Sequence, residues 1–240
     1  MPHLLNGVLL DLIEHQRFGV EYQPIVKLKT NEVVAYEALS RFYDVTGKAI
    51  RPDLVYSSLH DNPLSLYQVE YAQKCLQLDH MPKNHQVFVN LDQDAFYACG
   101  GEVLDNPILG AIQQVGKGRV IVELIENSEI NDALMSLSMI ETFSDLGIGT
   151  ALDDLCNPRS MLSVSVMQLV EWIKLDKHVL KMQDDKRYMV FVSKIIDFAH
   201  ATGKSVILEG VETDKDLAFA TLMGVDYVQG FLYREDFIRI

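Results

Sequence analysis

The sequence predicts an α/β fold in the form of a (β/α)8 TIM-like barrel whose first strand is antiparallel to the rest. Short apolar, β-branched runs recur along the whole chain, each run ends in a polar residue, and amphipathic helical patterns lie between the runs. The chain has 240 residues, 48% of them hydrophobic, and no linker-like segment. This length and composition suit one barrel domain over residues 1–240.

The first two strands are predicted at residues 19–28 and 33–37, and only residues 29–32 connect them. A connection this short leaves no room for a crossover helix, so the two strands are expected to form an antiparallel hairpin. The first strand is therefore the reversed member of the barrel.

Six strand–helix repeats are predicted to follow the hairpin. Their continuous apolar runs are typical of strands buried on both faces, and they lie at residues 87–90, 120–123, 150–154, 172–174, 206–209 and 227–229. Helical patterns at residues 134–146 and 192–199 each end before a glycine, at Gly147 and Gly203. No run resembles a polar edge strand, so the eight strands are predicted to close into a barrel.

Charge and composition argue against several classes of protein. The net charge of 21 − 34 = −13 disfavours binding to long nucleic acid, because that binding depends on clustered Lys and Arg. No apolar stretch approaches the ~20 residues of a membrane helix, and the N-terminus lacks a signal-peptide pattern. The three widely spaced cysteines suit a reducing compartment, so a cytoplasmic location is expected.

Polar side chains follow the predicted strands and are expected to meet at one mouth of the barrel, where barrel enzymes place their sites. They are Glu37, Asn90, Glu123, Asp153, Asp154, Lys174, Glu209 and Gln229. Carboxylates this close raise each other's pKa unless cations are present, and oxygen ligands favour Mg²⁺, Mn²⁺ or Ca²⁺. Asp153 and Asp154 could bridge or divide between two ions about 3.5–4 Å apart, the spacing used for in-line attack on phosphate esters.

Each of these residues taken alone also has a structural interpretation, as a helix N-cap, a loop acid or an exposed charge at a strand end. That interpretation weakens for the whole set, because consecutive strands would then all have to end in polar residues by accident. The set therefore predicts a metal-dependent phosphodiesterase site.

The segment at residues 36–42, Tyr-Glu-Ala-Leu-Ser-Arg-Phe, resembles the signature of EAL domains, the cyclic di-GMP phosphodiesterases. Further matching blocks follow the family order over essentially the whole chain, at residues 22–25, 88–90, 123–126, 153–154, 174–176, 209–212 and 229–231. A lone Glu-Ala-Leu tripeptide would carry no weight, whereas the ordered blocks are specific. The resemblance implies a single EAL-type barrel that hydrolyses cyclic di-GMP to linear 5'-pGpG.

The resemblance also implies a site for two Mg²⁺ or Mn²⁺ ions, with a single ion as the alternative. The ligands would be Glu37, Asn90, Glu123 and Asp153 for one ion, and Asp153, Asp154 and Glu209 for the other. A water between two cations would attack phosphorus. Lys174 would orient or polarise that water, and it is assigned a catalytic role together with Glu37 and Glu209.

Substrate contacts are implied in the same way. Arg41 would grip a phosphate, for which a guanidinium fork is better suited than an ammonium. Other residues of the substrate-binding group would be Gln23, Asp176, Glu212 and Gln229, with Asp176 also supporting Lys174. Glu126 would act behind the metal ligands, by bracing the loop after Asp154. The implied partner is cyclic di-GMP, and no membrane is expected to take part.

The loop after Asp154 departs from the family pattern. Members usually continue with Phe-Gly-Thr-Gly-Tyr-Ser-Ser, whereas residues 155–161 of this chain, Leu155 to Met161, read Leu-Cys-Asn-Pro-Arg-Ser-Met. Cys156 and Pro158 replace the two glycines. Glycine permits positive φ and proline fixes φ near −65°, so a changed loop path is expected. In the family this loop positions the aspartates and contributes to dimer contacts, so turnover, the second metal and a homodimer all depend on it.

Three functions stay open from the sequence. The first is an active phosphodiesterase, and the second is a module that binds cyclic di-GMP or a protein partner with little or no hydrolysis. The third is an unrelated barrel enzyme with another phosphate substrate. The complete ligand set together with Lys174 favours the first, because a binding module has no need to keep them all.

Overall fold

The structure is a computed structural model, and it describes residues 4–100, 103–125, 130–158 and 162–240. Eight strands form a closed ring in the order β1-β2-β4-β5-β6-β7-β8-β9, with β9 pairing back to β1. The ring strands are β1 (Phe18–Lys27), β2 (Glu32–Tyr43), β4 (Gln86–Asn90), β5 (Val120–Ile125), β6 (Gly149–Leu155), β7 (Trp172–Leu175), β8 (Ser205–Leu208) and β9 (Tyr227–Val228). The predicted α/β barrel is confirmed.

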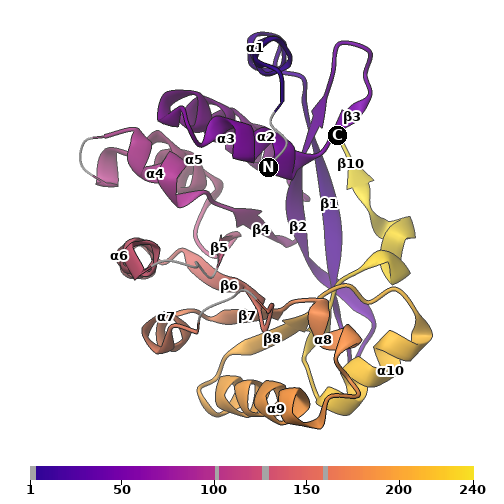
Figure 1. Cartoon of the computed structure of the whole chain (residues 1–240). Helices are drawn as coiled ribbons and strands as arrows, with labels where there is room; N and C mark the ends of the chain where they lie inside the picture. Colours follow the sequence, from indigo (N-terminus) through magenta and orange to yellow (C-terminus); the bar gives the residue numbers. More distant parts are fainter. Residues whose placement is uncertain (1–3, 101–102, 126–129, 159–161) are drawn as a thin grey trace.

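Strand β1 is antiparallel to both of its ring neighbours, β2 and β9. Every other neighbouring pair in the ring is parallel. The predicted reversal of the first strand is therefore confirmed. Its cause is the short turn between β1 and β2, which allows only an antiparallel hairpin. In Figure 1 this long hairpin forms one side of the barrel, and the shorter parallel strands complete it.

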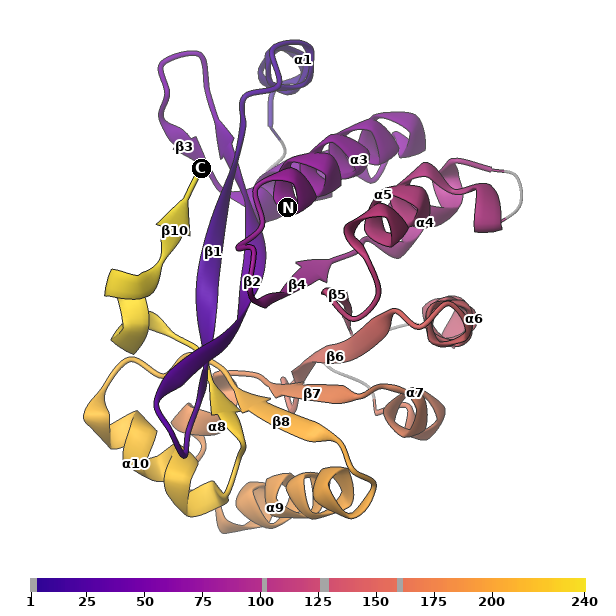
Figure 2. The same ribbon diagram turned by 180° about the vertical axis from the view of Figure 1, so that it is seen from behind.

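Helices cover the outside of the parallel strands, except for the first helix, which lies near the far end of the long hairpin, as Figures 1 and 2 show from opposite sides. They are α1 (Asn6–Glu14), α2 (Pro52–Leu59), α3 (Pro63–Asp79), α4 (Gln93–Ala98), α5 (Pro107–Val115), α6 (Ile130–Asp145), α7 (Val164–Leu169), α8 (His178–Lys181), α9 (Lys186–Ala201) and α10 (Asp214–Met223), with short 3₁₀ turns η1 (Val103–Asp105) and η2 (Phe231–Asp236). Local sequence signals explain several of their ends: proline is the first residue of α3 and α5, and Asn62 and Asn106 cap these two helices. Within the described ranges, no helix is both long and apolar enough to cross a membrane.

Two short strands lie outside the ring and extend the hairpin. Strand β3 (Ala49–Ile50) pairs with the end of β2, and β10 (Ile238–Arg239) pairs with β1. The prediction that Glu37 ends its strand is wrong, because β2 continues to Tyr43 by pairing with β1. The parallel pairing of β2 with β4 nevertheless stops at Ala38, opposite Val89. Glu37 therefore still lies at the C-terminal end of the parallel part of the barrel.

The barrel interior is filled in two layers, an apolar one and a polar one. Side chains of Ile25, Ala35, Phe88, Ile121, Ala151 and Ile207 pack together in the lower layer. Trp172 joins this layer, with its ring centroid 5.2 Å from that of Phe88 and 5.1 Å from that of Tyr227. The bottom of the barrel is therefore a packed core and not a pore.

The polar layer follows from the alternation of side chains along a strand, since residues two apart point to the same face. Each polar residue of the predicted set, Asp154 apart, lies two positions after an interior apolar residue. The pairs are Ala35 with Glu37, Phe88 with Asn90, Ile121 with Glu123, Ala151 with Asp153, Trp172 with Lys174, Ile207 with Glu209 and Tyr227 with Gln229. On the reversed β1, Gln23 instead lies two positions before Ile25. The same hydrophobic pattern that closes the barrel thus aims these side chains into its mouth.

Candidate active site

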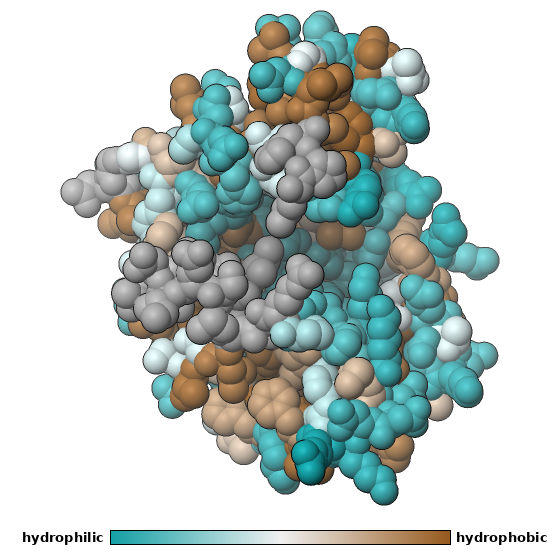
Figure 3. All heavy atoms as spheres, in the orientation of Figure 1, coloured by the Kyte–Doolittle hydropathy of each residue, from teal (hydrophilic) through white to brown (hydrophobic). Residues whose placement is uncertain are grey.

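A cleft of about 430 Å³ opens above the polar layer, at the C-terminal ends of the parallel strands. Its walls are formed by Gln23, Glu37, Leu39, Asn90, Asp153, Asp154, Asp176, Lys177, Glu209, Gly210, Glu212, Gln229, Gly230 and Phe231. In the orientation of Figure 1, the space-filling view in Figure 3 shows a largely hydrophilic surface around a hollowed centre, with apolar side chains gathered above and below it. Most predicted site residues therefore do converge on one cleft.

Lys174 lies at the centre of the polar layer and is fully buried. Its Nζ atom lies 2.6 Å from Glu123 Oε1, 2.7 Å from Glu209 Oε1, 3.0 Å from Asp153 Oδ1 and 3.3 Å from Glu37 Oε2. One ammonium thus contacts four carboxylates that come from four different strands or strand ends. Burial lowers the pKa of a lysine, but these carboxylates outweigh burial and hold the pKa of Lys174 well above its usual value.

Glu37 is fixed by two amide side chains, one at the end of β4 and one directly after β9. Asn90 Nδ2 donates to Glu37 Oε1 at 3.0 Å, and Gln229 Nε2 donates to Glu37 Oε2. Burial opposes ionisation of this carboxyl, but the Lys174 ammonium and these hydrogen bonds outweigh it and lower the pKa of Glu37. Glu37 is therefore an oriented carboxylate whose ionised form is favoured, and the Asn90 amide oxygen takes no part in this hydrogen bond.

The remaining carboxyls of the layer hold protons more tightly than usual. Burial, together with the charge of Glu37, raises the pKa of Glu123 and Asp153. Burial and the charge of Asp153 raise the pKa of Glu209 to about 8 and that of Asp154 to about 7. A single ammonium is thus insufficient to balance the carboxylates of this site, and added cations would complete the balance.

The carboxylates are arranged in two triads that share one residue. Ligand atoms of Glu37, Glu123 and Asp153 lie within 4.8 Å of one another, as do those of Asp153, Asp154 and Glu209. Both oxygens of Glu123 and Oδ1 of Asp153 are buried without a well-aligned hydrogen bond from any described residue. Glu123 Oε1 and Asp153 Oδ1 form ion pairs with Lys174. Buried oxygen donors with spare coordination capacity fit hard divalent cations such as Mg²⁺ or Mn²⁺.

The second triad depends on a strained turn at the end of β6. Asp154 has a φ of +55° and Cys156 a φ of +69°, both in the left-handed region that glycine prefers. Cys156 therefore adopts a conformation that glycine favours, at one of the positions where the family has glycine. The Tyr188 hydroxyl donates to the Cys156 carbonyl at 2.6 Å and helps to hold the turn. Residues 159–161 of the loop lie outside the described residues.

Arg41 is not among the residues that line the cleft. It lines a neighbouring pocket of about 380 Å³, which shares Leu39 and Asn90 with the cleft. Its Nη2 atom lies 2.6 Å from Oε1 of the buried Glu21, and its Nη1 donates to the Ser40 carbonyl. In this structure the guanidinium is thus committed to a carboxylate that the sequence did not single out.

The other predicted residues are placed as follows. Gln23, Glu212 and Gln229 line the cleft, and so does Asp176, whose Oδ1 accepts the backbone N–H of His178 at 2.6 Å. Glu126 lies outside the described residues. Cleft residues that were not predicted as site residues are Leu39, Lys177, Gly210, Gly230 and Phe231. All but Lys177 lie within the sequence blocks that resemble the family, and Lys177 directly follows Asp176, so adjacency to a predicted site residue is the signal that could have found it.

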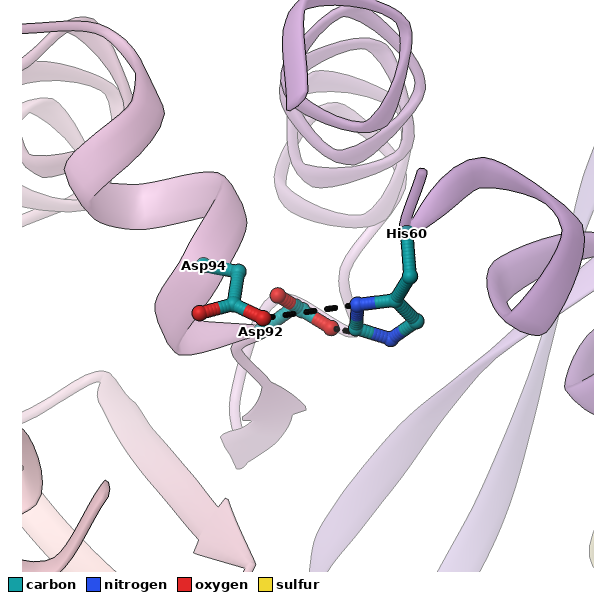
Figure 4. Close-up of side chains that lie close together, drawn as sticks. All are labelled: His60, Asp92 and Asp94. Carbon is teal, nitrogen blue, oxygen red and sulfur yellow. Dashed lines mark ion pairs between the residues drawn. The ribbon is translucent and has the colours of Figure 1, made fainter. Parts of the chain in front are cut away.

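A second cluster of potential metal ligands lies outside the cleft. Figure 4 shows His60 from the end of α2 facing Asp92 and Asp94 at the start of α4. The imidazole lies 3.5 Å from an oxygen of Asp92 and 3.4 Å from one of Asp94. Asp92 also caps α4 by accepting the N–H of Ala95 at 2.9 Å. Capping and ion pairing account for all three groups, which tie two helix ends together next to the loop that carries Asn90.

Comparison with known proteins identifies the same family over almost the whole chain. The EAL domain family matches residues 7–236. The chain is 29% identical over 244 residues to the "Probable cyclic di-GMP phosphodiesterase PdeB" of Escherichia coli (strain K12), covering 96% of this chain and 46% of PdeB. The chain thus spans less than half the length of this relative.

Solved structures show the same fold. The structure of the PaMucR phosphodiesterase in complex with c-di-GMP matches with a TM-score of 0.78 at 24% identity, over 95% of this chain and 96% of that one. The Bacillus subtilis YkuI protein, with an EAL domain and in complex with c-di-GMP and calcium, matches with a TM-score of 0.78 at 20% identity, over 93% of this chain and 56% of that one. From the family match, the barrel and its reversed strand, the chain belongs to the EAL domain family.

Proposed function

We propose that this domain is a metal-dependent phosphodiesterase that hydrolyses cyclic di-GMP to linear 5'-pGpG. The observation that carries the proposal is the pair of carboxylate triads that share Asp153 around a buried lysine. Relatives named as cyclic di-GMP phosphodiesterases and a solved complex with c-di-GMP support the choice of substrate.

The proposed ligands are Glu37, Asn90, Glu123 and Asp153 for one Mg²⁺ or Mn²⁺ ion and Asp153, Asp154 and Glu209 for a second. Such ions supply Lewis acidity, which lowers the pKa of water and offsets phosphate charge. In the hydrolysis, an oxygen of water bonds to phosphorus while one bridging P–O bond breaks, and the departing oxygen takes up a proton. Lys174 keeps its four carboxylates within reach of one another and adds a fixed positive charge at the base of the cleft.

Hydrolysis of cyclic di-GMP by the purified domain is the direct test. With Mg²⁺ or Mn²⁺, linear product is expected to accumulate on a chromatogram, whereas EDTA and the Glu37→Ala variant should abolish it. Glu32→Ala is the matched control, because Glu32 is an exposed glutamate at the start of the same strand. A wild-type protein that binds cyclic di-GMP in the presence of metal but forms no product would contradict the proposal.

That outcome would favour the second candidate, a module that binds cyclic di-GMP or a partner without turnover. Two observations favour this candidate: Cys156 holds a left-handed conformation at its usual cost of about 1–3 kcal/mol, and Arg41 is paired with Glu21 and does not line the cleft. The first feature affects the turn that positions Asp154, and the second affects a predicted phosphate contact. Neither feature removes a proposed metal ligand.

Metal binding is expected to strengthen as pH rises. Asp154 and Glu209, with pKa values of about 7 and about 8, keep their protons in the metal-free protein at lower pH, and a divalent cation must displace those protons. Both pKa values are raised above those of the unfolded chain, so the contribution of these two groups to metal-free stability is largest in acid and is lost as pH rises through 7 to 8. The increase in melting temperature caused by millimolar Mg²⁺, relative to EDTA, should therefore be larger at about pH 8.5 than at about pH 6. An equal or larger increase at the lower pH would refute this expectation.

A further inference from the structure

The cleft carries one lysine that the proposed hydrolysis leaves without a role. Lys177 is the residue just before α8, it is exposed, and it forms part of the cleft wall. Lys174, by contrast, is fully buried beneath the cleft, and Arg41 lines the neighbouring pocket. Among the described residues that line the cleft, Lys177 is the only one with a cationic side chain.

The side chain of Lys177 is packed against the cleft wall by its contact with Gly210. A β-carbon built on Gly210 would lie 2.4 Å from Cβ and 3.5 Å from Cδ of Lys177. The aliphatic stem of the lysine therefore runs across Gly210, the residue that follows Glu209 of the second triad. Gly210 also has a φ of +71°, so both the backbone conformation and the close approach require glycine here.

The remaining charged residues of the cleft wall are acidic: Glu37, Asp153, Asp154, Asp176, Glu209 and Glu212. A cyclic dinucleotide brings two phosphodiester groups, each with one negative charge, into this cleft. Cations held by the two triads would offset the charge of the phosphate that reacts. The other phosphate would face the acidic wall at distances within the Debye length of about 8 Å, where salt screens repulsion only in part.

We propose that Lys177 binds the non-reacting phosphate of a cyclic dinucleotide and so determines the preference of the cleft for substrates with two phosphodiester groups. This inference rests on the proposed function. An ammonium on a flexible stem binds phosphate as a point charge, without the fixed geometry of a guanidinium fork. Lys177 is therefore expected to affect substrate affinity and not the chemical step.

The test compares three substitutions of Lys177 with a matched control, Lys181→Ala, at the exposed last residue of α8, which does not line the cleft. Lys177→Ala should raise KM for cyclic di-GMP about tenfold, with kcat within about twofold of wild type. Lys177→Glu should raise KM further, and Lys177→Arg should keep most of the affinity. The slope of log KM against log salt should be shallower in Lys177→Ala, because one phosphate contact is lost.

Unchanged KM in Lys177→Ala, or a fall in kcat without a change in KM, would overturn this inference while leaving the proposed function intact. Binding of cyclic di-GMP in the presence of Ca²⁺ gives a second readout, with the same tenfold weakening expected in the dissociation constant. If the wild-type protein binds cyclic di-GMP without hydrolysing it, the comparison of dissociation constants between wild type and Lys177→Ala alone tests the role of Lys177. If the wild-type protein neither binds nor hydrolyses cyclic di-GMP, both proposals fail. Equal melting temperatures of the variants would show that folding is not the cause of a difference.

Discussion

Replacement of Lys174 by methionine is expected to reduce the hydrolysis of cyclic di-GMP by at least about a thousandfold and to destabilise the metal-free protein by about 3–5 kcal/mol. The ammonium lies within 3.3 Å of four carboxylates, and its positive charge offsets part of their negative charge. Without it, Glu37, Glu123, Asp153 and Glu209 must either take up protons or repel one another in a buried environment. The loss of stability should therefore be largest at alkaline pH, and added Mg²⁺ should restore part of it.

Urea denaturation in EDTA and in Mg²⁺, at two pH values, measures the stability effect, and product formation measures the activity effect. Lys181→Met is the matched control, since this exposed lysine lies outside the cleft. A Lys174→Met protein as stable as wild type in EDTA at alkaline pH would show that the carboxylates do not depend on this ammonium.

Asp153→Asn should remove both metal sites at once and reduce activity by at least about a thousandfold, because Asp153 is the residue that the two triads share. The same substitution should stabilise the metal-free protein, since the charge of Asp153 raises the pKa of Glu123 and Glu209 through repulsion. A lower activity together with a higher free energy of unfolding would show that the substitution removes a metal ligand and does not damage the fold.

Asp154→Asn provides the comparison, because Asp154 belongs to the second triad alone. Titration with Mn²⁺, followed by the paramagnetic signal of the free ion, should give two ions for wild type, one for Asp154→Asn and none for Asp153→Asn. Two bound ions in Asp153→Asn, or one in wild type, would contradict the shared-ligand arrangement.

The sequence alone was sufficient for the fold and for most of the cleft. The short connection between the first two strands predicted the hairpin, because a connection of this length allows only antiparallel pairing. The continuous apolar runs predicted the closed ring, because such runs are typical of strands buried on both faces. Residues such as Asn90 and Glu209 could also be predicted to meet. Side chains alternate between the two faces of a strand, so a polar residue two positions after an interior apolar one also points into the barrel, at its mouth.

Other features depend on contacts between segments far apart in the sequence. The length of β2 beyond Glu37 is set by its pairing with β1, and the position of Arg41 is set by Glu21, which also accepts from Arg239 at the C-terminal strand. The conformation of Cys156 also could not be read from the sequence: this residue adopts a φ of +69°, whereas a side chain of its type favours negative φ. A backbone preference of a few kcal/mol can be overruled by surrounding packing, which the sequence does not display.

The sequence by itself thus determined the barrel, its reversed first strand and the polar residues at its mouth, because these follow from periodicity and from the length of the connections. Only the tertiary structure decided how the charges are shared: one buried ammonium among four carboxylates, two triads meeting at Asp153, and Lys177 held against the cleft wall by Gly210. The physical reason is that charge balance and close approach depend on distances of a few ångström across strands, which no pattern along one strand can fix.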